Sequence, residues 1–343
     1  MSTSENKVKI GAEAEDKGLE FVCERYGIAK ETAKRYRRNY RKSTRDIDQT
    51  IIDSNTTIQQ IIAQYSEKEL KQLANGKVFH RESSTAIHKF DGDTLKIGVW
   101  SDTHIGSKYT NYDYILGAMD EFEREKVDFI VHAGDVTEGL SNRQGHMYEC
   151  TEIGYKAQKE KAIELLSQWD LTEQYMISGN HDMWYMKSAG ANIVKDICDA
   201  IPNATFLGDD EGTVIIPKDY LNVDIYDDDG LFVETKDVHI DHDIRLWHGL
   251  DGSSYATSYR VQKLVESLTG GNKPSCLITG HVHKMGYFFE RHIHCLSAGC
   301  IQKQSKWMRG KKLQAHVGFW IIEMTLNEKG IARFKPEFYP FYM

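Results

Sequence analysis

From Thr94 onward the sequence predicts an α/β fold, because short apolar segments alternate with longer amphipathic segments. Residues 95–100 and 127–132 have the length and the apolar content of buried strands, and residues 111–126 between them show the apolar spacing of a helix. The alternation then continues with a predicted helix over 148–169, a strand over 173–177 and a helix over 189–200. A sheet whose strands are joined by helices is therefore the expected architecture.

Residues 209–243 interrupt this alternation with a strongly acidic segment. They contain twelve Asp or Glu residues and two Lys residues around short apolar runs, a composition that predicts strands and solvated hairpin turns. After this segment, the sequence predicts a helix over 255–268, a strand over 275–279 and antiparallel strands over 287–297 and 316–338. We therefore expect mixed sheets.

The composition is that of a soluble globular protein, with 343 residues of which 40% are apolar and 27% are charged. The sequence holds no apolar run as long as a membrane span, and its polar N-terminus lacks the apolar segment of a signal peptide. The six cysteines show no CxxC spacing, which argues against a disulfide framework and against a thiolate zinc site. We expect a cytoplasmic protein with reduced thiols and no membrane partner.

Positive charge is concentrated in a segment near the N-terminus. Residues 25–45 contain nine Lys or Arg and one acid, so they carry +8 and the rest of the chain −16 within a net charge of −8. Helices are predicted over 18–26 and 31–40 around Gly27, a pattern similar to DNA-binding helix-turn-helix units. The second helix would present to DNA phosphates the cations Lys34, Arg35, Arg37, Arg38 and Arg41. A solvated basic helical hairpin without a partner is the alternative interpretation.

Residues 46–75 form a further predicted helical region, in which Ile47, Ile51, Ile58 and Ile62 recur at helical spacing. This apolar stripe predicts packing against the α/β domain or against a second subunit. A homodimer formed through the N-terminal helices is therefore one expected assembly. The sequence thus divides into a helix-turn-helix-like basic module over 1–45, a helical linker over 46–94 and an α/β domain over 95–343.

Polar side chains stand at the ends of five predicted strands. The stretch Ser178–Asp182 comes directly after the strand over 173–177, and similar motifs occur before and after it. In order, the motifs are Asp102-x-His104, Gly134-Asp135, Gly179-Asn180-His181-Asp182, His248-Gly249 and Gly280-His281-x-His283. Because open α/β folds bind ligands at the carboxyl ends of their strands, we expect these side chains to converge.

The residue types in these motifs favour a site for two metal ions. Three Asp or Asn oxygens and four His nitrogens form a hard-to-borderline ligand set, which suits Mn²⁺, Fe or Zn²⁺ rather than a thiolate-bound zinc. These ligands are too many for one ion with open positions. Two ions about 3.5–4 Å apart would need a shared carboxylate.

Together, the five motifs resemble those of the calcineurin-like metallophosphoesterases, in the order that this family shows, over about residues 95–338. The resemblance implies an α/β/β/α sandwich of two mixed sheets, preceded here by a small all-α N-terminal region. It implies two divalent cations, with Mn²⁺ expected first and Fe, Zn²⁺ or Mg²⁺ as alternatives. It assigns Asp102, His104 and His283 to the first ion, Asn180, His248 and His281 to the second, and Asp135 to both.

The resemblance also implies a mechanism, in which a hydroxide that bridges the two ions attacks phosphorus in line and His181 protonates the leaving oxygen. His181 needs a carboxylate to hold its ring, and Glu138 and Asp182 are both candidates. Glu138 stands where phosphatase relatives have Asp, and no Arg follows it, which argues against a Ser/Thr phosphatase. Arg143 and His146, in the loop after Glu138, are candidate contacts to the substrate phosphate.

The fold and the metals leave the substrate open in this class of protein. Because a helix-turn-helix-like module precedes a domain similar to phage-encoded and repair-type phosphoesterases, we expect hydrolysis of phosphodiester bonds in DNA by a nuclease. The acidic body repels phosphates, so the N-terminal module would supply most of the attraction. One alternative is a small-molecule phosphodiesterase or phosphomonoesterase. Another is a DNA-binding regulator with a catalytically silent phosphoesterase body.

Overall fold

The computed structural model separates the chain into two compact units, Met1–His80 and Arg81–Met343. It describes residues 9–10, 12–14, 16–30, 32–37, 83–169, 172–226, 232–250, 252, 256–269, 272–327 and 330–342. The linker helices expected over 46–75 lie outside the described residues, and so do Arg38 and Arg41. The homodimer expected from that linker therefore stays a prediction.

In the first unit, helical stretches enclose a small apolar core. Helix α2 (Leu19–Tyr26) ends at Gly27, whose φ of 61° lies in the left-handed region that glycine adopts without strain. The described residues of 9–16 and of 30–37 are helical on either side of it. The core takes side chains from all three stretches, namely Ile10, Ala14, Val22 and Ala33.

The first sheet of the second unit has six strands in the order β12-β11-β2-β3-β4-β5. Four of them run parallel: β2 (Thr94–Trp100), β3 (Phe129–His132), β4 (Glu173–Ile177) and β5 (Ala204–Gly208). Strands β11 (Gly318–Asn327) and β12 (Gly330–Pro340) continue the sheet in antiparallel orientation. The carboxyl ends of the four parallel strands therefore share one edge.

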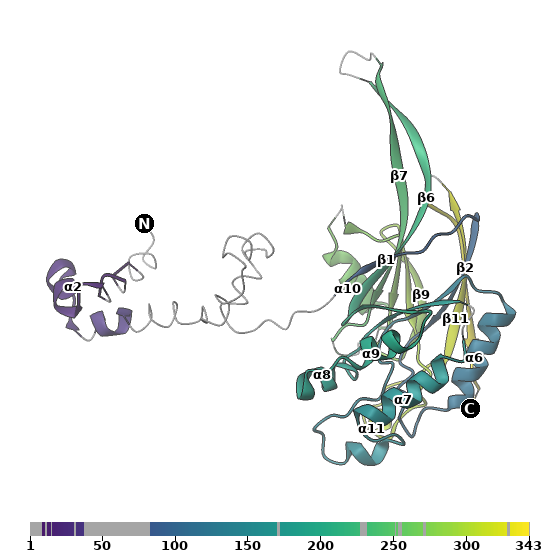
Figure 1. Ribbon diagram of the computed structural model, residues 1–343, viewed down its shortest axis with the longest axis horizontal. Coiled ribbons are helices and arrows are strands. Elements are labelled where there is room, and N and C mark those ends of the chain that lie inside the picture. Colours follow the sequence, from purple (N-terminus) through teal and green to yellow (C-terminus); the bar gives the residue numbers. More distant parts are fainter. Residues whose placement is uncertain are drawn as a thin grey trace. The chain divides into compact units, whose positions relative to one another are not determined.

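The second sheet also has six strands, in the order β1-β6-β7-β8-β10-β9. These are β1 (Thr85–Ile87), β6 (Glu211–Tyr226), β7 (Phe232–Trp247), β8 (Cys276–Thr279), β9 (Met285–Glu290) and β10 (Ile293–Ala298). The pairs β1–β6, β7–β8 and β8–β10 are parallel, whereas β6–β7 and β9–β10 are antiparallel. In Figure 1, β6 and β7 extend beyond the other strands as a long hairpin. Strand β1 falls within the predicted linker, yet it pairs in this sheet.

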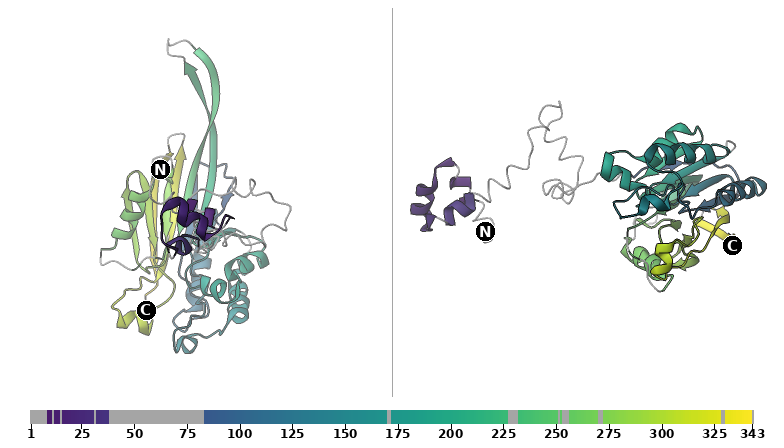
Figure 2. Two further views of the ribbon diagram at one scale, coloured as in Figure 1. Left: turned by 90° about the vertical axis from the view of Figure 1, so that its left-hand side faces the viewer. Right: turned by 90° about the horizontal axis from the view of Figure 1, so that it is seen from below.

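The two sheets pack face to face, and helices cover their outer faces (Figure 2). Between the sheets, Ile97 and Val131 pack in one cluster with Val214 and Ile278. A second cluster joins the first sheet to α6 (Tyr112–Arg124), α7 (Tyr155–Leu166) and α9 (Ile193–Ala200). A third joins the second sheet to α10 (Tyr259–Ser267). The predicted α/β/β/α sandwich of two mixed sheets is confirmed. No helix among the described residues has the length and apolarity to cross a membrane.

Two predicted helices are shorter than the sequence suggests. The helix expected over 148–169 begins only at Tyr155, because Gly154 has a φ of 90° and the preceding residues form a 3-10 turn, η2 (His146–Glu149), and a loop. The helix expected over 189–200 is interrupted by Gly190, which ends α8 (Met183–Ala189) in the left-handed conformation. Helix α9 then starts afresh behind an Asn192 cap. In addition, α11 (Lys306–Gly310) forms where the sequence analysis predicts no element.

Candidate metal centre

The two sheets bring their predicted ligands to a common edge. The ligands follow strand ends: Asp102 and His104 follow β2, Asp135 follows β3, Asn180 follows β4, His248 follows β7, and His281 and His283 follow β8. Strands β2, β3 and β4 are parallel neighbours in one sheet, and β7 and β8 are parallel neighbours in the other. Ligands from both sheets approach within hydrogen-bonding distance of one another, as the contacts below show.

The backbone at five of these ligands lies in the left-handed region, which is uncommon for residues other than glycine. The φ angles are 53° at Asp102, 45° at His104, 53° at Asp135, 79° at His281 and 55° at His283. Such conformations cost on the order of 1–3 kcal/mol each and persist where the surroundings enforce them. Here the amide of Asp102 donates to the Gly134 carbonyl (2.9 Å), and the amide of His104 donates to the Asp135 carbonyl (3.1 Å).

Two motif glycines allow the ligand loops to approach closely. A Cβ atom on Gly179 would collide with the backbone and the carboxylate of Asp135. A Cβ atom on Gly134, which has a φ of 92°, would collide with the ring of His248. A side chain at either position would therefore displace a ligand.

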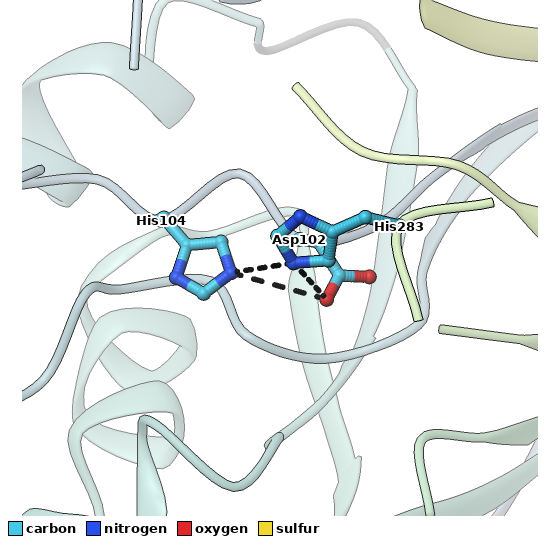
Figure 3. A group of neighbouring side chains, drawn as sticks. All are labelled: Asp102, His104 and His283. Carbon is cyan, nitrogen blue, oxygen red and sulfur yellow. Dashed lines mark hydrogen bonds and ion pairs between the residues drawn. The ribbon is translucent and has the colours of Figure 1, made fainter. Parts of the chain in front are cut away.

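Asp102, His104 and His283 form the first ligand cluster, and all three side chains are buried (Figure 3). The Nε2 atoms of His104 and His283 are 3.1 Å apart. Asp102 Oδ1 lies 3.2 Å from His283 Nε2 and 3.9 Å from His104 Nε2. Two imidazole nitrogens that face each other beside a carboxylate need a proton or a cation between them. This donor set fits a divalent metal ion.

Asp135, His248 and His281 form the second cluster, with the side-chain amide of Asn180 beside them. Asp135 Oδ2 lies 3.2 Å from His248 Nε2, and Asn180 Oδ1 lies 2.6 Å from His281 Nδ1. His248 Nδ1 donates to the Ala133 carbonyl (2.7 Å), which leaves Nε2 to face the carboxylate. Asp135 Oδ2 is also 3.8 Å from Nε2 of His104 in the first cluster. The Asp135 carboxylate therefore lies between the two clusters.

The pKa values in these clusters reflect the crowding of buried charge. Burial would raise the pKa of Asp102, but the adjacent His283 holds it below its ordinary value. Burial would lower the pKa of His248, but Asp135 raises it to about 9. Burial and the neighbouring His248 lower the pKa of His281 to about 4. The low pKa values of Asp102 and His281 favour an ionised carboxylate and a neutral imidazole, the forms in which these groups bind metal ions.

Glu138 supports a metal-site histidine through its buried side chain. Its Oε2 atom lies 3.0 Å from His104 Nδ1, and its Oε1 atom lies 2.9 Å from His146 Nε2. Gln302 also donates to this carboxylate, at 3.0 Å. Burial would raise the pKa of Glu138, but His104 and His146 hold it below its ordinary value. A carboxylate behind a ligating ring fixes the orientation of that ring and directs its other nitrogen at the metal position.

The ring of His181 is held by a main-chain carbonyl. Its Nδ1 atom lies 2.8 Å from the carbonyl oxygen of Glu138, which can only accept, so Nδ1 carries the proton. The nearest carboxylate oxygen of Glu138 is 4.0 Å from the same nitrogen. The ring of Trp184 lies against the imidazole with centroids 4.0 Å apart, and burial lowers the pKa of His181. The main-chain carbonyl of Glu138, and not its carboxylate, therefore orients the ring of His181.

Asp182, the other expected partner of His181, binds backbone amides. Its carboxylate accepts from the amides of Val136 (3.0 Å), Thr137 (2.8 Å) and Gly179 (2.8 Å), and from the Thr137 hydroxyl (2.7 Å). Burial and the nearby Asp135 raise its pKa to about 6. The structure therefore revises the role of Asp182, because this residue ties the loop after β3 to the loop after β4.

A cavity of about 470 Å³ opens over both clusters, and His181 and Arg143 line it. Arg143 pairs with Glu149 at 2.7 Å on its wall. His146, the other expected phosphate contact, is buried behind Glu138, and its Nδ1 atom accepts from the amide of Ser141 (3.0 Å). Both ring nitrogens of His146 are thus engaged within the protein, so its role is revised to support of Glu138.

Three residues of the site escape the sequence analysis, namely Trp184, Gln302 and Trp307. Trp184 lies three residues after His181 on the following helix, and helical spacing could have indicated their contact. Gln302 joins the site only through the tertiary fold, by donating to Glu138 and to Ser107. Trp307 lines the cavity from α11, and the only sequence feature that could have drawn notice to it is the basic stretch in which it lies.

Comparison with known proteins places this architecture in a family. Residues 95–285, more than half of the chain, match the model of the calcineurin-like phosphoesterases, so the chain belongs to that family. With the two ligand clusters, this membership makes it a metal-dependent phosphoesterase.

Several solved structures are similar to the chain at low identity. An archaeal phosphodiesterase is 16% identical over 71% of this chain and 100% of its own, with a TM-score of 0.36. The phosphoesterase Yfce from E. coli is 13% identical over 70% of this chain and 98% of its own, with a TM-score of 0.33. The calcineurin-like phosphoesterase YfkN from Bacillus subtilis is 13% identical over 72% of this chain and 90% of its own, with a TM-score of 0.35. No curated protein matches the chain.

Proposed function

We propose that the chain is a nuclease that hydrolyses phosphodiester bonds in DNA. The observation that carries this proposal is a basic helical unit on the same chain as a phosphoesterase domain. In that unit Ala33 packs into the core, whereas Lys34 and Arg35 are exposed on the helical stretch of residues 32–37 and Arg37 is half-buried. A basic helix behind a glycine turn suits the phosphate backbone of DNA.

Two divalent ions are proposed at the two clusters, and Mn²⁺ is the proposed metal because the ligands are oxygen and imidazole without thiolate. Asp102, His104 and His283 would hold one ion, Asn180, His248 and His281 the other, and Asp135 would contact both. When bound, such ions neutralise charge on the phosphate and lower the pKa of a water molecule that serves as the nucleophile.

His181 is the proposed proton donor to the leaving oxygen. The Glu138 carbonyl keeps a proton on Nδ1, so Nε2 of the protonated ring can donate toward the cavity that His181 lines. Burial lowers the pKa of this ring, which makes its protonated form a stronger acid. Trp184 packs against the ring and limits its rotation.

A small-molecule phosphodiesterase or phosphomonoesterase is the second candidate, and the cavity favours it. Its volume of about 470 Å³ falls within the ~300–1,000 Å³ typical of small-ligand sites. Such an enzyme would hydrolyse cyclic nucleotides or monoesters and leave DNA intact.

A cleavage assay separates the two candidates. End-labelled single-stranded, duplex and closed circular DNA are incubated with Mn²⁺ and the full chain, with Asp135→Ala as the control. We expect cleavage by the wild-type protein and none by the variant, because Asp135 lies between both ligand clusters. Hydrolysis of a chromogenic diester without any cleavage of DNA would contradict the nuclease and favour the second candidate.

A further inference from the structure

A second basic element lies within the phosphoesterase domain, in the segment that joins β10 to β11. Residues 303–312 contain five Lys or Arg and no acid, in a body that is otherwise acidic. Four of these cations are exposed, namely Lys306, Arg309, Lys311 and Lys312. Trp307, between the first two of them, is 49% exposed. We call residues 303–313 the basic rim.

Hydrogen bonds fix the conformation of the basic rim. The amide of Met308 donates to Ser305 Oγ (3.2 Å), and the amide of Leu313 donates to the Met308 carbonyl (2.9 Å). Gln304 Nε2 donates to the Leu313 carbonyl at 2.6 Å. Met308 is consequently buried, and Trp307 projects outward beside it. An aromatic side chain on a fixed turn loses little conformational freedom on binding.

The basic rim and the metal clusters line one cavity. Asp135 and His283 contribute to its wall, and so do Trp307, Met308 and Leu313 of the rim. A phosphate held at the metal clusters would therefore have an apolar, aromatic surface within the same cavity. That surface matches the flat apolar face of a nucleobase.

The rim cations are available to an external anion. None of the four exposed cations pairs with a carboxylate within the described part of the chain. Lysines on the helices differ, since Lys161 pairs with Glu164 (2.8 Å) and Lys263 pairs with Glu266 (3.5 Å). Unpaired cations grouped around an exposed tryptophan are the arrangement that binds single-stranded nucleic acid.

We propose that the basic rim binds an unpaired DNA strand and presents it to the metal centre. One base stacks on Trp307, and the flanking phosphates contact Lys306, Arg309, Lys311 and Lys312. The inference rests on the proposed nuclease function and narrows its substrate to single strands or frayed ends, because bases within an intact duplex are already stacked on both faces. The catalytic domain then supplies an attraction of its own, in addition to that of the N-terminal unit.

The stacking contact is tested by measuring how tightly the full chain binds a six-nucleotide deoxythymidine strand. The affinity is measured by fluorescence anisotropy in the presence of a chelator. Trp307→Ala should weaken binding about tenfold, since stacking on an aromatic side chain has effects of that order. Trp307→Phe should restore most of the affinity. A strand of the same length built from abasic residues should bind wild type and Trp307→Ala equally. Unchanged affinity for the deoxythymidine strand, or equal loss on both strands, would overturn the stacking role.

The salt dependence of the same binding tests the phosphate contacts. Replacing Lys306, Arg309, Lys311 and Lys312 by Gln should reduce the slope of log K against log salt by up to about 3, at roughly 0.7 for each contact. The matched control replaces by Gln four cations that do not line the cavity, namely Lys195, Lys263, Arg333 and Lys335. Equal slopes for wild type and the rim variant would overturn the proposal.

The two proposals fail in distinguishable ways. If the wild-type chain binds the single strand through the rim but cleaves no DNA with Mn²⁺, the nuclease function fails and the rim stands. If the chain cleaves DNA and the rim variants bind and cleave single strands like wild type, the rim fails and the nuclease function stands.

Discussion

The floor and the rim of one cavity are built on opposite principles. The floor is the group of seven predicted metal ligands, five of which line the cavity itself. It is crowded and partly strained, and further bonds support it, because His104 Nδ1 bonds the Glu138 carboxylate and His248 Nδ1 donates to the Ala133 carbonyl. The rim, residues 303–313, is basic and largely exposed, and most of its hydrogen bonds join its own residues. Side chains that are crowded and bonded like those of the floor tolerate few substitutions, so they restrict the site to one class of reaction. Exposed side chains like those of the rim can be substituted at little cost in folding free energy. If the proposed DNA contacts at the rim are correct, the substrate is selected by the part of the cavity whose side chains the fold constrains least.

The largest effect should follow from removing the support of the floor at Asp182. Asp182→Ala leaves three buried amides and a hydroxyl without their acceptor, at about 1–3 kcal/mol for each unsatisfied group. We expect the free energy of unfolding to fall by at least about 3 kcal/mol, and metal binding to be lost with it. Denaturant unfolding and metal content measure both. The control variant is Asp199→Ala, which replaces an exposed acid on α9. Equal stability of the two variants would contradict the claim that the hydrogen bonds of Asp182 stabilise the loops of the floor.

The next largest effect should come from replacing Glu138. This replacement should disturb the orientation of a metal ligand without destabilising the fold. Glu138→Gln keeps the side-chain volume but removes the charge beside His104 and His146. We expect Mn²⁺ affinity to fall about 10–100-fold with little change in stability, as for other partners of ligating histidines. Isothermal titration with Mn²⁺ is the measurement. Glu149→Gln, in the same cavity but paired with Arg143, should keep the wild-type affinity. Equal affinities for both variants would show that Glu138 does not orient the ligand.

The N-terminal basic helix and the rim should favour different forms of DNA, duplex for the helix and single strands for the rim. Replacing Lys34, Arg35 and Arg37 by Gln should lower the salt slope of duplex binding by up to about 3, at about 0.9 for each contact, and weaken duplex cleavage. Hydrolysis of a small chromogenic diester should stay at the wild-type rate. The rim variant should show the converse preference, with single strands affected more than duplex. If both variants reduce the binding and cleavage of duplex and single-stranded DNA in the same proportion, the two basic elements do not differ in the DNA that they bind.

The floor was predictable because its signals are local. Each motif is two to four residues long and follows a recognisable strand, and parallel pairing carries the strand ends to one edge whatever the loops do. The rim gave no such signal. Helix α11 has five residues, too few for a helical period to appear, and nothing in the sequence of residues 303–313 indicates the cavity that they line in the folded chain.

Two other misses have the same physical origin. The helix expected over 148–169 has a helical pattern throughout, but its first part is drawn into a loop by the Thr151 amide, which donates to the Gly106 carbonyl (2.7 Å). A sequence shows side-chain types, so it offers the carboxylates of Glu138 and Asp182 as the partners of His181. The atom that the ring meets is a backbone oxygen, which every residue has and which only the fold can position.

The smallest effect concerns His294, a histidine outside both floor and rim. It stacks on Phe334 (centroids 4.1 Å apart) with Nδ1 lying 2.9 Å from the Tyr287 hydroxyl, and burial lowers its pKa. The unfolded chain therefore takes up a proton near pH 6.5 before the folded chain does, so stability is complete above that pH and is lost as the pH falls through it. His294→Phe should flatten the fall in melting temperature between pH 6.5 and 5 by about 1–2 °C. The measurement is made with Mn²⁺ bound, because floor histidines that hold metal cannot take up these protons without releasing it. An equal pH dependence in wild type and in His294→Phe would show that His294 does not contribute.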